Sequence, residues 1–157
     1  MQGKTHVLGG AAAGLLYLSV NSANDPLLFV SSCAVGALIP DIDHTGSTLG
    51  RKIPLLDNVI SGLFGHRTFT HSLLFLFLAF LLFKFTHWNI DFEFGILIGM
   101  FSHMVLDALT KEGIQFLWPL KIRIRIPLGI RTGGPLEKVF MLALVLYIAY
   151  CGYQKIV

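Results

Sequence analysis

Charged side chains are scarce in this 157-residue chain: Asp, Glu, Lys and Arg make up 13% of it, whereas hydrophobic residues make up 54%. An ordinary soluble domain has about 25% charged residues. So few charges could not cover the surface of a small water-soluble globule, so much of this surface should face lipid. We therefore expect one domain, residues 1–157, that is embedded in a membrane.

Cysteine is nearly absent, and the motifs of several enzyme classes are missing. Cys33 and Cys151 lie in apolar runs, which favours core positions over a disulfide or a metal site. The chain has no G-x-S-x-G elbow, no Walker A motif and no G-x-G-x-x-G fingerprint. We also expect no cleavable signal peptide at its start. These absences argue against a disulfide scaffold, an elbow-type serine hydrolase, a P-loop NTPase and a dinucleotide-binding enzyme.

Five apolar runs, residues 7–20, 27–39, 73–85, 92–109 and 139–153, predict the fold class. Most are shorter than the roughly 20 residues that cross a bilayer, so we predict an all-α membrane protein with about five transmembrane or half-spanning helices. Lys and Arg concentrate in the connections 41–72 and 110–138, and are missing from 21–26 and 87–91. The positive-inside rule then places both basic connections and the N-terminus in the cytoplasm.

The second basic connection contains a segment of alternating residues, Lys-Ile-Arg-Ile-Arg-Ile-Pro at 121–127. A period of two is typical of a strand, and residues 129–131 could pair with it after the turn at Pro127. We predict a small cytoplasmic β-hairpin near residues 121–131. Its basic face would suit an anionic headgroup or the bilayer surface.

Three polar clusters border the apolar runs, and the predicted topology places all of them at the cytoplasmic face. The first is His103 and Asp107, which lie four residues apart and share one face of a helix. They could bind one metal ion or two neighbouring ions; the alternative is a hydrogen bond that ties helices together. We favour the metal, because ionisable groups at membrane depth usually mark a functional site.

The second cluster is Asp41-Ile42-Asp43-His44, which supplies carboxylate oxygens and an imidazole within four residues. This mixture suits zinc or manganese. Asp41 and His44 are favoured as ligands over Asp43, because positions i and i+3 can face one way. The structural alternative is a helix cap and turn, which needs only one of the two aspartates.

The third cluster lies at residues 65–72, where His66 and His71 flank Arg67. A helix that starts near Thr70 would let the two histidines converge. The planar guanidinium of Arg67 suits bidentate binding of a phosphate or carboxylate. Its structural alternative is an anchor to lipid headgroups.

Two further candidates open the first and the last helix. A lone histidine such as His6 is more often structural, but the predicted topology returns it to the same membrane face. Glu137 follows a Gly-rich turn and is either a helix-start acid stabilised by the macrodipole or a general base. One zinc ion needs fewer ligands than the sequence offers, so two metals that share a carboxylate would use the full set: His6, Asp41, His44, His66, His71, His103 and Asp107.

Together these motifs resemble a family of small bacterial inner-membrane proteins classed as metal-dependent hydrolases, some described as LexA-linked. The resemblance covers essentially the whole chain, and the His-Arg-Thr-x-Thr-His-Ser element at 66–72 is its most specific part. It implies a multi-pass protein of the bacterial inner (cytoplasmic) membrane with metal-dependent hydrolase activity. A more distant similarity to the all-helical zinc phospholipase C and nuclease group is an analogy that fixes no substrate.

We predict a hydrolase that holds one or two Zn²⁺ ions, with Mn²⁺ as the alternative, and cleaves a phosphoester or other ester of a membrane lipid. Arg67 would hold the phosphoryl oxygens, and Glu137 or Asp43 would move the proton. The expected partners are a lipid substrate and the bilayer, with no nucleic acid; the oligomeric state is not predicted. The alternatives are a metal-ion transporter, a non-enzymatic membrane adaptor with a structural metal and, more weakly, a nuclease.

Overall fold

The computed structural model describes residues 1–43 and 68–156, and over these ranges the protein is all-helical, as predicted. Each of the five apolar runs forms an α-helix. Two short 3-10 helices, η1 and η3, lie between α2 and α4. The elements are α1 (Gly3–Leu18), α2 (Pro26–Gly36), η1 (Pro40–Asp43), η3 (Phe69–His71), α4 (Leu73–Thr86), α5 (Ile90–Ala108) and α6 (Pro135–Ile156).

Polar caps set the starts of three helices. Asp25 accepts a hydrogen bond from the backbone N–H of Leu28, with Pro26 in the first turn of α2. Ser72 caps α4 and Asn89 caps α5 in the same way. The helix that follows the third polar cluster therefore begins at Leu73, three residues later than the predicted start near Thr70, because Ser72 caps it.

The core of the bundle is the contact of α5 with α2 and α1, and glycines make this contact close. A Cβ atom on Gly99 of α5 would overlap the carbonyl oxygen of Cys33 in α2 and lie 2.7 Å from the backbone nitrogen of Ala37. A Cβ on Gly36 would lie 2.8 Å from the Cα of Ile96. Small residues at such crossings are typical of helix packing in membranes, where close backbone approach replaces the hydrophobic effect.

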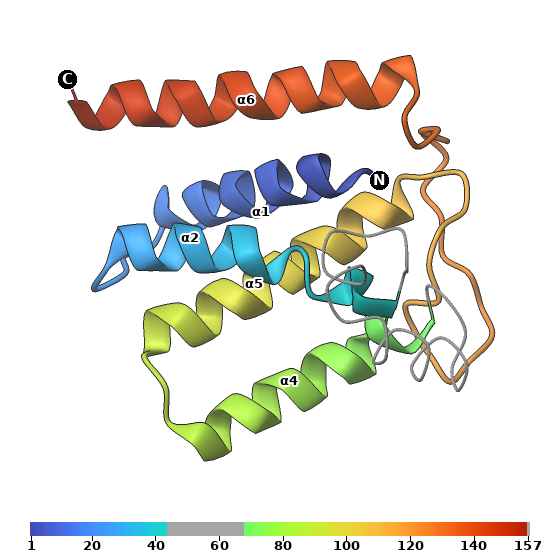
Figure 1. Ribbon diagram of the computed structural model, residues 1–157, viewed down its shortest axis with the longest axis horizontal. Coiled ribbons are helices and arrows are strands. Elements are labelled where there is room, and N and C mark those ends of the chain that lie inside the picture. Colours follow the sequence, from blue (N-terminus) through green and yellow to red (C-terminus); the bar gives the residue numbers. More distant parts are fainter. Residues whose placement is uncertain (44–67, 157) are drawn as a thin grey trace.

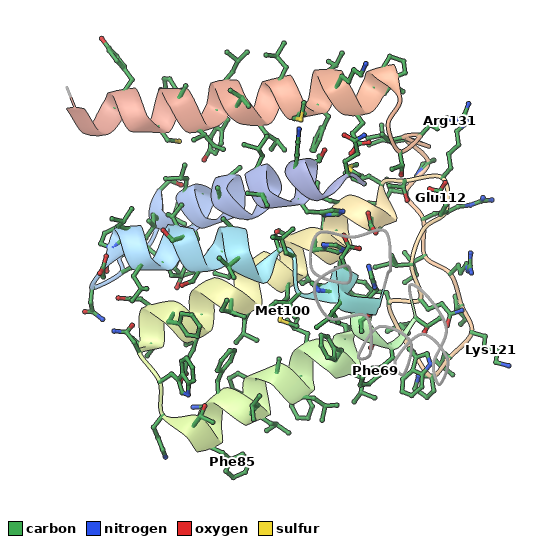
Figure 2. The ribbon with its side chains drawn as sticks, viewed as in Figure 1. Phe69, Phe85, Met100, Glu112, Lys121 and Arg131 are labelled. Carbon is green, nitrogen blue, oxygen red and sulfur yellow. The ribbon has the colours of Figure 1, made fainter. Side chains whose placement is uncertain are left out.

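The outer helices, α4 and α6, present large apolar side chains to the surroundings. No residue of α4 is buried, and Phe77, Leu82 and Phe85 are among its exposed side chains; Phe85 points away from the bundle (Figure 2). The segment Pro135–Gln154 of α6 is the one helix, within the described ranges, that is long and apolar enough to cross a membrane. Helix α5 has 19 residues but carries three acidic ones, and the other apolar helices are shorter. The five-span topology and its orientation remain predictions.

The elements that carry the polar clusters meet at one end of the bundle (Figure 1). The start of α1, the segment after α2, η3, the end of α5 and the start of α6 all lie there. The α1–α2 and α4–α5 connections and the C-terminus lie at the opposite end. Lys121 and Arg131 project outward from the α5–α6 connection at the polar end (Figure 2).

The hairpin predicted near residues 121–131 is wrong for the part of the chain that the structure describes. Ile124 forms two backbone hydrogen bonds, of 2.9 and 3.1 Å, with Ile114 instead, and Ile130 bridges to Thr110. The N–H of Ile126 donates to the carbonyl of Ala108 at 2.7 Å. Carbonyls at the end of a helix lack intrahelical partners, so the end of α5 takes donors that a hairpin would have used internally.

Candidate metal centre

Helix α5 places His103 and Asp107, one turn apart, at the polar end of the bundle, and both side chains are fully buried. Nδ1 of His103 lies 2.7 Å from the carbonyl oxygen of Ala37, at the end of α2. A carbonyl can only accept, so Nδ1 carries the proton and Nε2 presents a lone pair. This is the tautomer of a histidine that binds a metal through Nε2.

The second histidine comes from η3, directly before α4. Nε2 of His71 lies 3.0 Å from Nε2 of His103, and its Nδ1 lies 3.0 Å from the hydroxyl oxygen of Thr70. Thr70 and His71 are both buried. The Thr70 hydroxyl therefore orients the ring, so that the two Nε2 atoms face one point.

Two carboxylates close the cluster around these nitrogens. Oδ1 of Asp41, in η1, lies 3.8 Å from Nε2 of His71 and 3.7 Å from Nε2 of His103. Oδ2 of Asp107 lies 3.7 Å from each of the same nitrogens. One ligand atom from each of the four residues thus falls within 4.8 Å of the other three.

These distances suit a small divalent cation. Four ligands placed tetrahedrally at typical zinc bond lengths are about 3.3–3.6 Å apart. The two histidine nitrogens lie 3.0 Å from each other and 3.7–3.8 Å from the oxygens of Asp41 and Asp107. Two imidazoles and two carboxylates are also the donor set that zinc and manganese accept. Asp41, His71, His103 and Asp107 could therefore hold a metal ion.

His6 lies behind this cluster, on the buried side of α1. Its ring stacks on the ring of His103, with centroids 3.7 Å apart and planes inclined by 15°. Its Nε2 lies 3.2 Å from Oδ1 of Asp107, which the amino group of Met1 also contacts. Asp107 thus directs one oxygen to the four-residue cluster and the other to His6.

Glu137 lies at the start of α6 and joins that helix to the start of α1. Its Oε1 accepts hydrogen bonds from the N–H of Gln2 at 2.6 Å and from the hydroxyl of Thr5 at 2.8 Å. Its Oε2 accepts from the N–H of Gly133 at 2.6 Å. Three donors therefore hold the carboxylate between two helices, outside the group of four that could share one ion.

We expect Glu137→Gln to lower stability while metal content stays unchanged. A glutamine amide nitrogen cannot accept a hydrogen bond, so at least one of the three donors loses its partner, at a cost of about 1–3 kcal/mol. The midpoint of thermal unfolding in detergent and metal analysis measure the two effects. Glu93→Gln is the matched control, since Glu93 accepts from the N–H of Trp88 at an exposed position. Unchanged stability of Glu137→Gln would contradict this structural role of the three hydrogen bonds.

The structure does not describe the remaining candidates. His44, His66 and Arg67 lie outside the described residues. Asp43 ends η1, and its side chain is likewise outside the described part of the protein. Two groups that orient the histidines of the cluster were not predicted. The carbonyl of Ala37, which contacts His103, is a backbone group and leaves no pattern in the sequence. Thr70, which orients His71, was interpreted as a helix start.

Comparison with known proteins gives a match to one family model, described as YdjM inner membrane protein, over residues 1–156. The chain is 46% identical over 157 residues to "Uncharacterized protein YvsG" of Bacillus subtilis (strain 168), covering 98% of this chain and 96% of that relative. It is 39% identical over 124 residues to "Inner membrane protein YdjM" of Escherichia coli (strain K12), covering 75% of this chain and 63% of that relative. No solved structure matches.

Proposed function

This chain belongs to the YdjM inner membrane protein family, and we propose that it is a membrane-embedded, metal-dependent hydrolase. Its substrate would be a phosphoester, or another ester, of a membrane lipid. The proposal includes a multi-pass arrangement in the bacterial inner membrane with the polar end on the cytoplasmic side, where the positive-inside rule puts the basic connections.

The single observation that carries the proposal is the convergence of Asp41, His71, His103 and Asp107. These residues come from three separate segments, and one atom from each lies within 4.8 Å of the others. Three of them are fully buried. Burying so many ionisable groups together is costly unless a cation compensates the carboxylates and uses the lone pairs of the imidazoles.

In the proposed hydrolysis, the residues of the cluster would hold the metal, and their exposure indicates from which side the substrate would approach. Asp41, His71, His103 and Asp107 would hold Zn²⁺ or Mn²⁺, which when bound supplies activated water and polarises the ester. The side chain of Asp41 is 13% exposed, whereas those of His71, His103 and Asp107 are inaccessible. Substrate would therefore approach along η1. His6, which is fully buried and stacks on His103, would exclude water from the opposite side.

Arg67 and Asp43 complete the proposal, with the roles that the sequence predicts for them. Arg67 would bind the anionic oxygens of the substrate, because its guanidinium can donate two parallel hydrogen bonds. Asp43 would move a proton to or from the reacting oxygen. His6 would hold Asp107 in place through the 3.2 Å contact between its Nε2 and Oδ1, or bind a second ion there.

A non-enzymatic role with a structural metal is the second candidate, and the deep burial of three ligands favours it. Structural zinc sites are closed by four protein ligands, whereas catalytic sites keep a position open. The four ligand atoms would fill a tetrahedral site by themselves. The partial exposure of Asp41 separates the two candidates, because a carboxylate at the surface can yield its position to water.

We expect protein purified without chelator to contain at least one zinc or manganese ion per chain. Elemental analysis measures the metal. Liposomes of phosphatidylglycerol, phosphatidylethanolamine and cardiolipin, resolved by mass spectrometry after incubation, measure hydrolysis. Chelation should stop turnover, and added metal should restore it. A substoichiometric metal content would refute the metal centre, while full metal content without cleavage of any ester would support the structural role.

A further inference from the structure

A groove of about 670 Å³ lies between α1 and α6, near the polar end of the molecule. Its walls are formed by the first turns of α1, by Leu38 after α2, and by Met141, Leu142 and Val145 of α6. Ligand pockets commonly have volumes of this size. Apart from two lysines, the side chains that line it are hydrocarbon or thioether, so it would accept an apolar chain.

The two lysines are Lys4, in the first turn of α1, and Lys138, in the first turn of α6. Both side chains are exposed, and neither forms an ion pair with an acidic group of residues 1–43 and 68–156. The nearest acid in sequence, Glu137, is instead turned into hydrogen bonds with Gln2, Thr5 and Gly133. The groove thus combines an apolar wall with two uncompensated positive charges at one end.

We propose that this groove binds an anionic phospholipid of the bilayer, with one acyl chain along α6 and the phosphate between Lys4 and Lys138. Basic residues at the membrane surface attract anionic headgroups, and an apolar channel below them matches the attached chain. A second copy of this chain fits poorly, because the chain has a net charge of +3 and would need to bring acids to both lysines.

This lipid site is distinct from the candidate metal centre. Lys4 and His6 are two residues apart on α1, a spacing that directs side chains to different sides of a helix. His6 is buried against His103, while Lys4 lines the groove. The bound lipid would therefore hold α6 against α1 rather than serve as substrate, and the site goes beyond the proposed hydrolase.

The charge test uses the double variant Lys4→Gln/Lys138→Gln of the full chain in detergent. Native mass spectrometry measures binding of palmitoyl-oleoyl phosphatidylglycerol, with the phosphatidylcholine of the same chains as the neutral probe. We expect the double variant to bind phosphatidylglycerol about 30-fold more weakly and to retain its metal. Lys84→Gln, near the end of α4, is the control and should bind like the unmodified protein.

The groove test uses Val145→Trp, which places an indole in the apolar part of the groove. Its matched control is Val139→Trp on the same helix, because Val139 is 65% exposed and does not line the groove. We expect Val145→Trp to lose the bound phosphatidylglycerol and Val139→Trp to keep it.

Three results would overturn the proposal. These are equal binding of the two lipids by the unmodified protein, unchanged phosphatidylglycerol binding by both the charge and the groove variants, or a change of oligomeric state in Val145→Trp while lipid stays bound. Because none of these measurements uses turnover, they leave the hydrolase proposal unaffected.

Discussion

Asp107→Asn is expected to remove the metal that we propose the cluster binds, and with it the proposed hydrolysis. Asp107 directs Oδ2 to the two histidine nitrogens at 3.7 Å and Oδ1 to His6 at 3.2 Å. An asparagine keeps the shape, but it loses the negative charge and has one oxygen in place of two, so it cannot offer an oxygen both to the histidine nitrogens and to His6. Mutating a residue that only hydrogen-bonds to a metal ligand already lowers metal affinity about 10–100-fold, so loss of a direct ligand should lower it more than about 100-fold. Elemental analysis and lipid turnover measure the two losses.

Asp91→Asn is the matched control, because it makes the same change at the other end of α5. Asp91 is also buried, and its Oδ2 accepts a hydrogen bond of 2.7 Å from the N–H of Asp25. An asparagine oxygen can still accept this bond, so metal content and turnover should remain. His71→Ala should reproduce the loss seen with Asp107→Asn. Metal retained at full occupancy in both Asp107→Asn and His71→Ala would show that the cluster is not the metal centre.

The part of the site that lies within one helix could be predicted from the sequence alone. His103 and Asp107 have helical spacing, so their common face follows from geometry. The positive-inside rule predicted that Asp41 and His71 lie on the same side of the membrane as this pair, and the structure brings all four together. By contrast, the contact of His103 with the carbonyl of Ala37 depends on how α2 crosses α5. Tertiary packing sets that crossing, and no local pattern in the sequence reports it.

The difference between local pattern and tertiary packing also explains why the hairpin predicted near residues 121–131 is wrong. The alternation of Ile and Arg indicates an extended backbone but not its partner. Ile124 pairs with Ile114, directly after the turn at Gly113, where φ is 61°. Glycine adopts this left-handed conformation without strain. The turn brings residue 114 to the extended segment, and Ile130, which the predicted hairpin needed, bonds instead to Leu109 and Lys111, directly after α5.

Gly99→Ala is expected to destabilise the protein strongly, whereas Gly152→Ala should have little effect. The added Cβ at position 99 would overlap the carbonyl oxygen of Cys33 and approach the backbone nitrogen of Ala37 to 2.7 Å. Both obstacles are backbone of α2, which cannot rotate away as a side chain can. Overpacking typically costs 1–3 kcal/mol, and we expect about 3 kcal/mol here. A Cβ added to Gly152 would meet no atom within 4 Å. The midpoint of thermal unfolding in detergent measures the difference.

The same substitution should also weaken metal binding in molecules that remain folded. Gly99 lies one turn before His103 on α5, and the backbone it touches ends at Ala37, whose carbonyl orients His103. Moving α2 and α5 apart by about 1 Å would stretch this 2.7 Å hydrogen bond beyond the range of a good one. It would also shift Asp41, which follows α2, away from Nε2 of His103. Metal affinity and stability should therefore fall together in Gly99→Ala. If stability fell while metal affinity held, the spacing of the two helices would not control the centre.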